Sequence, residues 1–219
     1  MSIILNIETS SKNCSVCLSS KGKILSYIEK EDKEFRHSEL LTSSIQNILN
    51  KNNLNVNELS SISVGIGPGS FTGLRIGLSV AKGLCYPHKI KLTCITSLKI
   101  IASSLIHENK NIISLIKDKG EYYYLAKYKP DLTEIIKPKY QLINSENMSS
   151  VLDDNSIIVV SSNDAKEHLS RTVKRKKEII KRSVSSIDMI SLSQKLFDQK
   201  KFEDIAYIEP MYIKKSYVS

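Results

Sequence analysis

Tryptophan is absent from the 219-residue chain, and proline and glycine are scarce, with five and eight residues. This scarcity excludes collagen-like chains and proline-rich disorder. No stretch approaches the roughly 18 uninterrupted apolar residues of a membrane helix. Residues 1–8 lack the basic residues that begin a secretion signal, and their apolar run stops at Glu8. We therefore expect a soluble, cytoplasmic protein with no membrane contact.

Cysteine and histidine are also few, with four residues of each. Cys14 and Cys17 have the C-x-x-C spacing, but no second pair accompanies them, and residues three apart in a strand face opposite sides. The histidines are scattered and form no pair with the spacing of a zinc hydrolase. The sequence therefore predicts no metal site and four reduced cysteines.

Basic residues outnumber acidic ones, 32 to 23, which gives a formal net charge of +9. This surplus allows an RNA or an acidic partner, and the composition of an AT-rich genome explains it equally well. Residues 171–182 hold seven basic residues against one acidic residue. We interpret this run as a solvated face rather than an RNA contact, because no aromatic residue interleaves with the charges.

The first hundred residues predict strands and helices in the order βββαβαβα. Alternating or continuous apolar residues predict strands at residues 2–8, 13–20, 24–29, 60–66 and 92–95. Apolar residues at helical spacing predict helices at residues 38–52, 73–86 and 97–107, the second of them stopped by Pro87. The close spacing of the first three strands indicates an antiparallel meander.

The second half of the chain has a weaker pattern. It predicts strands at residues 111–117, 121–129, 137–143 and 156–160 and a helix at residues 188–200. Because it begins again with adjacent strands, we expect a loose duplication. The predicted division is one subdomain at residues 1–103 and a second at residues 104–219, with the last residues packing back on the first.

A glycine-rich block lies between a predicted strand and a predicted helix. Five of the eight glycines fall between residues 65 and 77. Together with the acid and hydroxyls at the end of the first strand, the block could form an anion or nucleotide turn at a helix N-terminus. The candidate residues are Glu8, Thr9, Ser10, Gly67, Gly69, Ser70, Thr72, Gly73 and Arg75.

The named phosphate loops do not match this block. A Walker A loop needs lysine after its last glycine, where this chain has Leu74, and the dinucleotide pattern needs glycine where it has Thr72. Ser70 also lacks the framing of a nucleophile elbow. A tight strand-to-helix crossing, in which glycines permit close packing, explains the block equally well, and both interpretations stay open.

Four segments occur in a fixed order along the chain: residues 4–10 (ILNIETS), 37–41 (HSELL), 67–77 (GPGSFTGLRIG) and 81–84 (AKGL). Together they resemble one family, the bacterial TsaB/YeaZ proteins of threonylcarbamoyladenosine biosynthesis. The similarity covers residues 3 to 101, and later only residues 208–214 (IEPMYIK) resemble the family's closing segment. The family usually has Asp-Thr-Ser where this chain has Glu8-Thr9-Ser10.

The resemblance implies an α/β protein with the actin-like ATPase fold, which consists of two ribonuclease-H-like subdomains of mixed β-sheet flanked by helices. It also implies a non-catalytic accessory role in modifying adenosine 37 of tRNAs that read codons starting with A. The implied partners are the catalytic, metal-containing paralogue TsaD in a heterodimer, the ATPase TsaE, and tRNA through the complex. The chain alone is expected to form a homodimer.

The same resemblance implies that this chain is not an enzyme. Ser97 and Ile101 stand where the catalytic paralogue has a histidine pair four residues apart, and neither can replace an imidazole on a metal. We expect no cofactor bound by this chain itself, while the interface of the complex allows ATP or ADP. The partner interface is predicted on two helices, at Leu40, Leu41, Leu74, Leu78 and Lys82.

Two other functions stay open from the sequence. A small-molecule kinase or ATPase of the same fold would use Glu8, Thr9 and Ser10 together with the glycine turn. A tRNA-binding module would use the charge of +9 and the basic run at residues 171–182.

Overall fold

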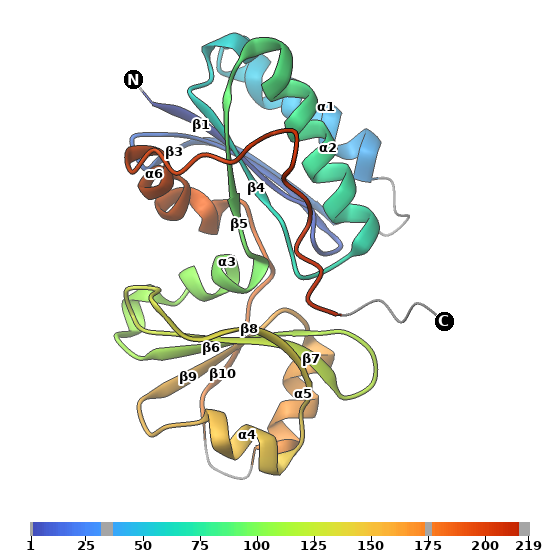
Figure 1. Ribbon diagram of the computed structural model, residues 1–219, viewed down its shortest axis with the longest axis vertical. Coiled ribbons are helices and arrows are strands. Elements are labelled where there is room, and N and C mark those ends of the chain that lie inside the picture. Colours follow the sequence, from blue (N-terminus) through green and yellow to red (C-terminus); the bar gives the residue numbers. More distant parts are fainter. Residues whose placement is uncertain (1, 32–36, 174–176, 215–219) are drawn as a thin grey trace. The chain divides into compact units, whose positions relative to one another are not determined.

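Two five-stranded mixed sheets, each with its own helices, form the computed structural model of this protein (Figure 1). The structure describes residues 2–31, 37–173 and 177–214. It divides into unit 1, residues 1–100 and 184–211, and unit 2, residues 101–183 and 212–219. None of the helices in these described ranges combines the length and apolar composition needed to cross a bilayer.

The sheet of unit 1 has the strand order β3-β2-β1-β4-β5. Its strands are β1 (Ile3–Glu8), β2 (Asn13–Ser20), β3 (Lys23–Glu31), β4 (Ser61–Gly65) and β5 (Lys91–Ile95). The first three strands form the predicted antiparallel meander, and β1, β4 and β5 run parallel. The carboxyl ends of β1 and β4 therefore lie side by side at one edge of the sheet.

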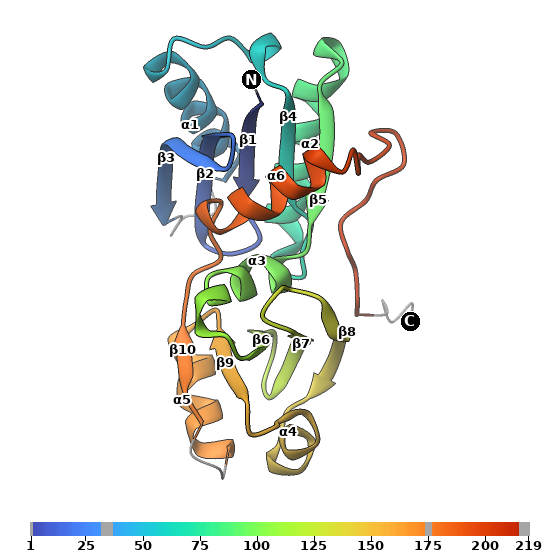
Figure 2. The same ribbon diagram turned by 90° about the vertical axis from the view of Figure 1, so that its left-hand side faces the viewer.

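Helices cover both faces of this sheet. The helices α1 (His37–Lys51) and α2 (Phe71–His88) pack on one face, and α6 (Ile190–Asp198) packs on the other (Figures 1 and 2). Burial on both sides explains why β1 and β4 are almost continuously buried.

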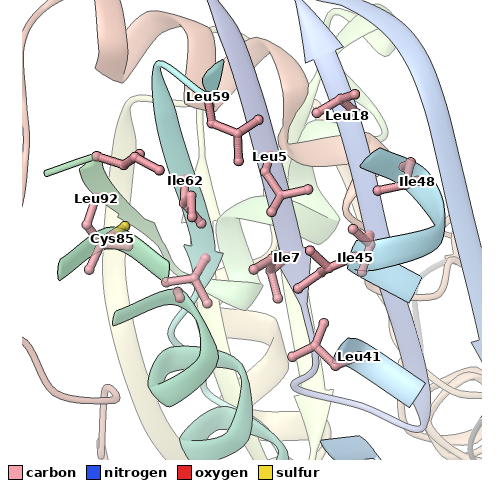
Figure 3. Close-up of a cluster of buried hydrophobic side chains, with 14 of the residues drawn as sticks. Leu5, Ile7, Leu18, Leu41, Ile45, Ile48, Leu59, Ile62, Cys85 and Leu92 are labelled. Atoms are coloured by element: carbon pink, nitrogen blue, oxygen red, sulfur yellow. The ribbon is translucent and has the colours of Figure 1, made fainter. Parts of the chain in front are cut away.

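The core of unit 1 lies between α1, α2 and the sheet. In Figure 3 the side chains of Leu41, Ile45 and Ile48 on α1 point toward the strand residues Leu5 and Ile7. These α1 residues recur at the spacing of one helix face, which is why the sequence pattern located this helix correctly.

Helix α2 is longer than predicted at both ends. Ser70 caps its N-terminus, because its hydroxyl accepts a hydrogen bond of 3.2 Å from the backbone N–H of Gly73. At the other end Pro87 lies inside the last turn, and Lys89 closes the helix in the left-handed conformation. The prediction that Pro87 stops the helix at residue 86 was wrong, because a proline in the final turn disturbs few of the helix hydrogen bonds.

Unit 2 repeats the topology of unit 1. Its sheet has the order β10-β9-β6-β7-β8, with a β6-β7-β8 meander and parallel β6, β9 and β10. The bounds are β6 (Asn111–Lys117), β7 (Tyr122–Tyr128), β8 (Glu134–Leu142), β9 (Ser156–Val160) and β10 (Ile179–Lys181). This shared topology confirms the actin-like fold class and matches the expected duplication.

The remaining helices are shorter than the sequence predicted or were missed. The structure has α3 (Ser97–Ser103), α4 (Ser145–Val151) and α5 (Asn163–Thr172), and three short 3₁₀ helices at Val56–Glu58, Ile106–Glu108 and Ile187–Met189. The sequence missed α4, α5 and β10, since α4 and α5 are short and polar and bury only two residues each.

The expected and observed divisions differ over residues 184–211, which belong to unit 1. Hydrogen bonds to the β2–β3 meander hold the start of this segment. The Ser185 hydroxyl donates to Glu29 at 2.7 Å, and the Ser186 backbone N–H donates to the Ser15 hydroxyl at 3.0 Å. Contacts this distant in sequence leave no local pattern.

Candidate functional site

The glycine-rich block forms the connection between β4 and α2, directly beside the turn that follows β1. The backbone N–H of Ser70 donates a 2.7 Å hydrogen bond to the Ser10 carbonyl oxygen, and the Thr9 hydroxyl donates to the Gly73 carbonyl oxygen at 2.8 Å. The structure therefore brings together the two candidate segments that the sequence placed 60 residues apart.

The glycines let these two segments approach closely. A Cβ atom on Gly69 would clash with the Ser10 carbonyl group, and one on Gly73 would clash with the Thr9 carbonyl oxygen. Gly69 also has a φ of +159°, at the limit of the range that side chains disfavour. The space over these glycines is thus filled by the chain's own backbone, which favours the tight-crossing interpretation.

Glu8 fills the space over another glycine of the block. Its side chain is fully buried, and a Cβ atom on Gly65 would clash with its carboxyl group. One carboxyl oxygen accepts a 2.5 Å hydrogen bond from the Ser10 backbone N–H, and the other has no hydrogen-bond partner among the described residues. Burial raises the pKa of Glu8, which favours its neutral form.

The N-terminal side chains of α2 do not line this turn. Thr72 and Arg75 are exposed, and the Arg75 guanidinium lies over the ring of Phe71, 3.7 Å from its centroid. Ser70 is engaged as the helix cap. Ser70, Gly69, Gly73 and Glu8 are thus engaged in contacts within the chain, which favours a structural role for this turn.

The segment near the C-terminus that resembles the family's closing segment also reaches this turn. The backbone N–H of Met211 donates a 2.8 Å hydrogen bond to the Ile66 carbonyl oxygen, and the Ser97 N–H donates to the Gly67 carbonyl oxygen at 2.7 Å. Backbone hydrogen bonds thus join the glycine turn to three other segments of the chain, at Ser10, Ser97 and Met211. Sequence reasoning did not pair Met211 with this turn, because the two are 145 residues apart.

Three of the five predicted interface residues belong to the core. Leu41, Leu74 and Leu78 are 0%, 2% and 4% exposed. This part of the interface prediction was wrong, because these leucines form the faces of α1 and α2 that pack on the sheet. Leu40 and Lys82 are partly exposed.

The outer face of α2 is instead formed by other residues. Phe71 and Tyr86 are 53% and 79% exposed, and Ser79 and Gly83 are exposed between them. A Cβ atom on Gly83 would meet nothing within 4 Å. Two exposed aromatic side chains thus lie on an otherwise polar outer face of α2.

A hollow of about 270 Å³ lies between α1 and α2 beside this face. Apolar side chains form its floor, and the polar side chains of Thr42, Gln46, Asn50 and Asn55 join them in its lining. The apolar residues are Ile45, Leu49, Leu54, Val56, Val80 and Leu84.

The described residues contain no group of three or more histidine, cysteine, aspartate or glutamate side chains that could hold a metal ion. Cys14 and Cys17 are buried in β2 without a disulfide, and burial raises the pKa of Cys17 to about 12. Ser97 and Ile101 are both buried. Lys174, Arg175 and Lys176 of the predicted basic run lie outside the described residues.

A family model described as "TsaD: tRNA N6-adenosine threonylcarbamoyltransferase" matches residues 28–207 of this chain. The TsaB protein of Escherichia coli is 28% identical over 58% of this chain and 55% of its own length, and that of Bacillus subtilis is 28% identical over 75% and 72%. The chain belongs to the TsaD/TsaB family.

Within the TsaD/TsaB family, the fold extends beyond the aligned sequence. The solved structure of YeaZ from Pseudomonas aeruginosa matches 97% of this chain and 100% of its own with a TM-score of 0.84, at 19% identity. The likeness therefore shows a common fold in both units. In sequence, the chain spans about half the length of the first curated relatives that it matches.

Proposed function

We propose that this protein is a non-catalytic accessory subunit required for threonylcarbamoyl transfer to adenosine 37 of tRNAs that read A-starting codons. It acts by binding the catalytic, metal-containing paralogue TsaD as a heterodimer, with TsaE and tRNA joining through the complex. This role belongs to the cytoplasm, where tRNA and ATP are present. The relatives named for threonylcarbamoyladenosine biosynthesis support the pathway.

The packing of the glycine turn carries the non-catalytic part of the proposal. Gly69 and Gly73 lie against the carbonyl groups of Ser10 and Thr9, and the Glu8 carboxyl group is buried against Gly65. A kinase or ATPase would need this turn open to phosphate. The turn instead serves to fix α2 against the sheet, which is what a docking subunit requires.

The outer face of α2 and the neighbouring hollow form the proposed partner surface. Phe71 and Tyr86 supply exposed aromatic area at the two ends of the helix, and Gly83 leaves room for a close approach between them. The apolar hollow between α1 and α2 would receive an apolar side chain of the partner. We propose that the same surface forms the homodimer when TsaD is absent.

The first experiment combines tRNA, threonine, bicarbonate, ATP and the other purified pathway proteins, with and without this chain. Nucleoside mass spectrometry measures threonylcarbamoyladenosine. Product that requires the chain supports the accessory role. Equal product with and without the chain would contradict it.

A variant pair tests the proposed surface. Gly83→Arg places a charge on the outer face of α2, where the backbone tolerates a side chain. Asn47→Arg places the same charge on an exposed position of α1 that does not line the hollow. Loss of co-elution with TsaD in Gly83→Arg alone supports the surface. Co-elution of both variants would place the interface elsewhere.

The ATPase alternative is tested on the isolated chain. Calorimetric titration with millimolar ATP and Mg²⁺ should show no binding, because Glu8 and the Ser10 carbonyl group occupy the space over the glycine turn. Saturable binding with phosphate release would contradict the non-catalytic role and favour the ATPase.

A further inference from the structure

Three tyrosines of unit 2 form a compact aromatic cluster on one face of its sheet. The rings of Tyr122 on β7 and Tyr140 on β8 stack with centroids 5.3 Å apart and planes 15° from parallel. Tyr124 faces Tyr140 across the strands, with centroids 4.9 Å apart and planes tilted by 46°. Tyr140 thus has an aromatic neighbour on each side, and we call these three residues the tyrosine platform.

Polar contacts hold the platform in one conformation. The Tyr140 hydroxyl donates a 2.8 Å hydrogen bond to the Asp118 carboxylate. The Lys214 ammonium lies 3.1 Å from the same carboxylate oxygen and 5.3 Å from the centre of the Tyr140 ring. Because the central ring is fixed, a ligand that stacks on the platform loses little side-chain entropy on binding.

The outer ring of the platform is open. Tyr122 is 45% exposed, whereas Tyr123, its neighbour in sequence, points to the opposite face, where it is buried and bonded to His168 at 2.9 Å. Tyr140, the cross-strand neighbour of Tyr122, lies on β8, the edge strand of the described sheet. Tyr122 therefore offers an exposed aromatic surface that stacks on the fixed ring of Tyr140.

Two lysines lie near the platform, together with the acidic residues Asp118 and Glu121. Lys119 is exposed in the turn before Tyr122. The backbone N–H of Tyr122 donates a 3.1 Å hydrogen bond to the carbonyl oxygen of Lys119, which closes this turn. The Lys214 side chain is 41% exposed.

We propose that the tyrosine platform binds an unpaired base of RNA, which stacks on Tyr122 while Lys119 and Lys214 contact the flanking phosphates. Stacked aromatic rings with neighbouring cations on a sheet face are the features that recognise single-stranded RNA. Tyr122 is the most exposed ring of the platform and has charged residues beside it, which suits a base between phosphates better than an apolar protein surface. The platform could stack a base of any single-stranded RNA. That the RNA is tRNA rests on the proposed function, in which tRNA is the substrate of the complex.

Direct binding to the full chain tests the platform. The probes are a fluorescein-labelled decamer of adenylate and an RNA duplex of the same length, whose bases cannot stack on a protein ring. Fluorescence anisotropy at low salt should show tighter binding of the single strand. Tyr122→Ala should weaken that binding by about tenfold or more, and Tyr122→Phe, which keeps the ring, should stay within about twofold.

Two further variants separate stacking from general charge attraction. Tyr207→Ala removes a tyrosine that is 83% exposed in unit 1 and should bind like the parent. Lys119→Ala should lower the slope of log affinity against log salt by about 0.7. Lys181→Ala removes a lysine of β10, at the opposite edge of the sheet, and should leave the preference for single strands unchanged.

Equal affinity of Tyr122→Ala and the parent, or equal binding of duplex and single strand, would overturn the platform. Loss of TsaD co-elution in Tyr122→Ala with unchanged RNA affinity would make this surface a protein contact and would also overturn it. Co-elution with TsaD, which Gly83→Arg addresses, does not depend on the platform. The two proposals can therefore fail independently.

Discussion

The hydroxyl of Thr9 donates a 2.8 Å hydrogen bond to the carbonyl oxygen of Gly73. This bond joins the turn after β1 to the first turn of α2, at a place where a Cβ atom on Gly73 would have no room. The glycine block thus couples a helix to the central strand of its sheet. Because α2 also carries the proposed partner surface, the block helps to position that surface.

Substitution of the buried and the open glycines of α2 should have opposite effects on stability. Gly73→Ala should lower the free energy of unfolding by about 1–3 kcal/mol, because its methyl group meets the Thr9 carbonyl oxygen. Gly83→Ala should raise it by about 1 kcal/mol, because alanine favours the helix and the position is open. Urea denaturation of both variants measures the difference. A stabilising Gly73→Ala would show that the turn is not packed as described.

Replacement of Glu8 should change how stability depends on pH. Burial raises its pKa above 4.5, so its contribution is fully present below pH 4.5 and is lost as the pH rises through the folded-state value. Glu8→Gln removes this loss and should be more stable than the parent at pH 7.5, with a difference that shrinks toward pH 4.5. Urea titrations at both pH values measure this difference in the free energy of unfolding. Glu39→Gln, which replaces an exposed glutamate of α1, is the control. Parallel curves for Glu8→Gln and the parent would contradict the raised pKa.

A buried lysine should make unit 2 sensitive to loss of its acidic partner. The Lys127 ammonium lies 2.7 Å from Asp153 and donates to the Val151 carbonyl oxygen at 2.7 Å. Asp153→Ala should destabilise the protein by about 1–3 kcal/mol, because it removes the counter-ion of a buried lysine while the aspartate itself is 41% exposed. Asp164→Ala, which breaks a pair with an exposed aspartate, should cost less than about 1 kcal/mol. Thermal unfolding of the two variants compares them, and equal losses would refute the distinction.

The same aspartate predicts a loss of stability in acid. Burial alone would raise the pKa of Asp153, but hydrogen bonds from Lys127, Ser156 and Asn111 outweigh it and lower the pKa to about 2. Stability from this group is therefore present above pH 3.8 and is lost as the pH falls toward 2. Asp153→Ala should lack this component of the acid transition. Circular dichroism between pH 2 and 5 follows it, and an unchanged acid transition in the variant would argue against the lowered pKa.

Leu78→Glu and Gly83→Arg should abolish TsaD binding for different reasons. Leu78 is 4% exposed, so a glutamate there should unfold unit 1 and prevent every interaction. Gly83→Arg should keep the far-ultraviolet spectrum and the unfolding temperature of the parent while losing only the partner. Circular dichroism combined with gel filtration separates the two effects. If the Leu78→Glu protein were folded and monomeric, the result would contradict the burial of Leu78 in the core of unit 1.

The local pattern of the sequence was sufficient for the strands and long helices of unit 1. The apolar residues of β1, β4 and α1 recur at the periods of a strand and a helix, and the glycine block located the start of α2 to within two residues. The short polar helices α4 and α5 left no such pattern. The sequence also could not distinguish which leucines of α1 and α2 face the sheet and which face outward, since both helices are apolar over a broad stripe.

By itself, the sequence determined the family, the order of elements in unit 1 and the residues of the glycine turn, because these depend on contiguous patterns. Only the tertiary structure decided what the turn does. The contacts of Glu8 with Gly65, of Thr9 with Gly73 and of Ile66 with Met211 join residues at least 57 positions apart. Whether glycines cradle a phosphate or the chain's own backbone depends on what occupies the space above them, and long-range packing alone determines that.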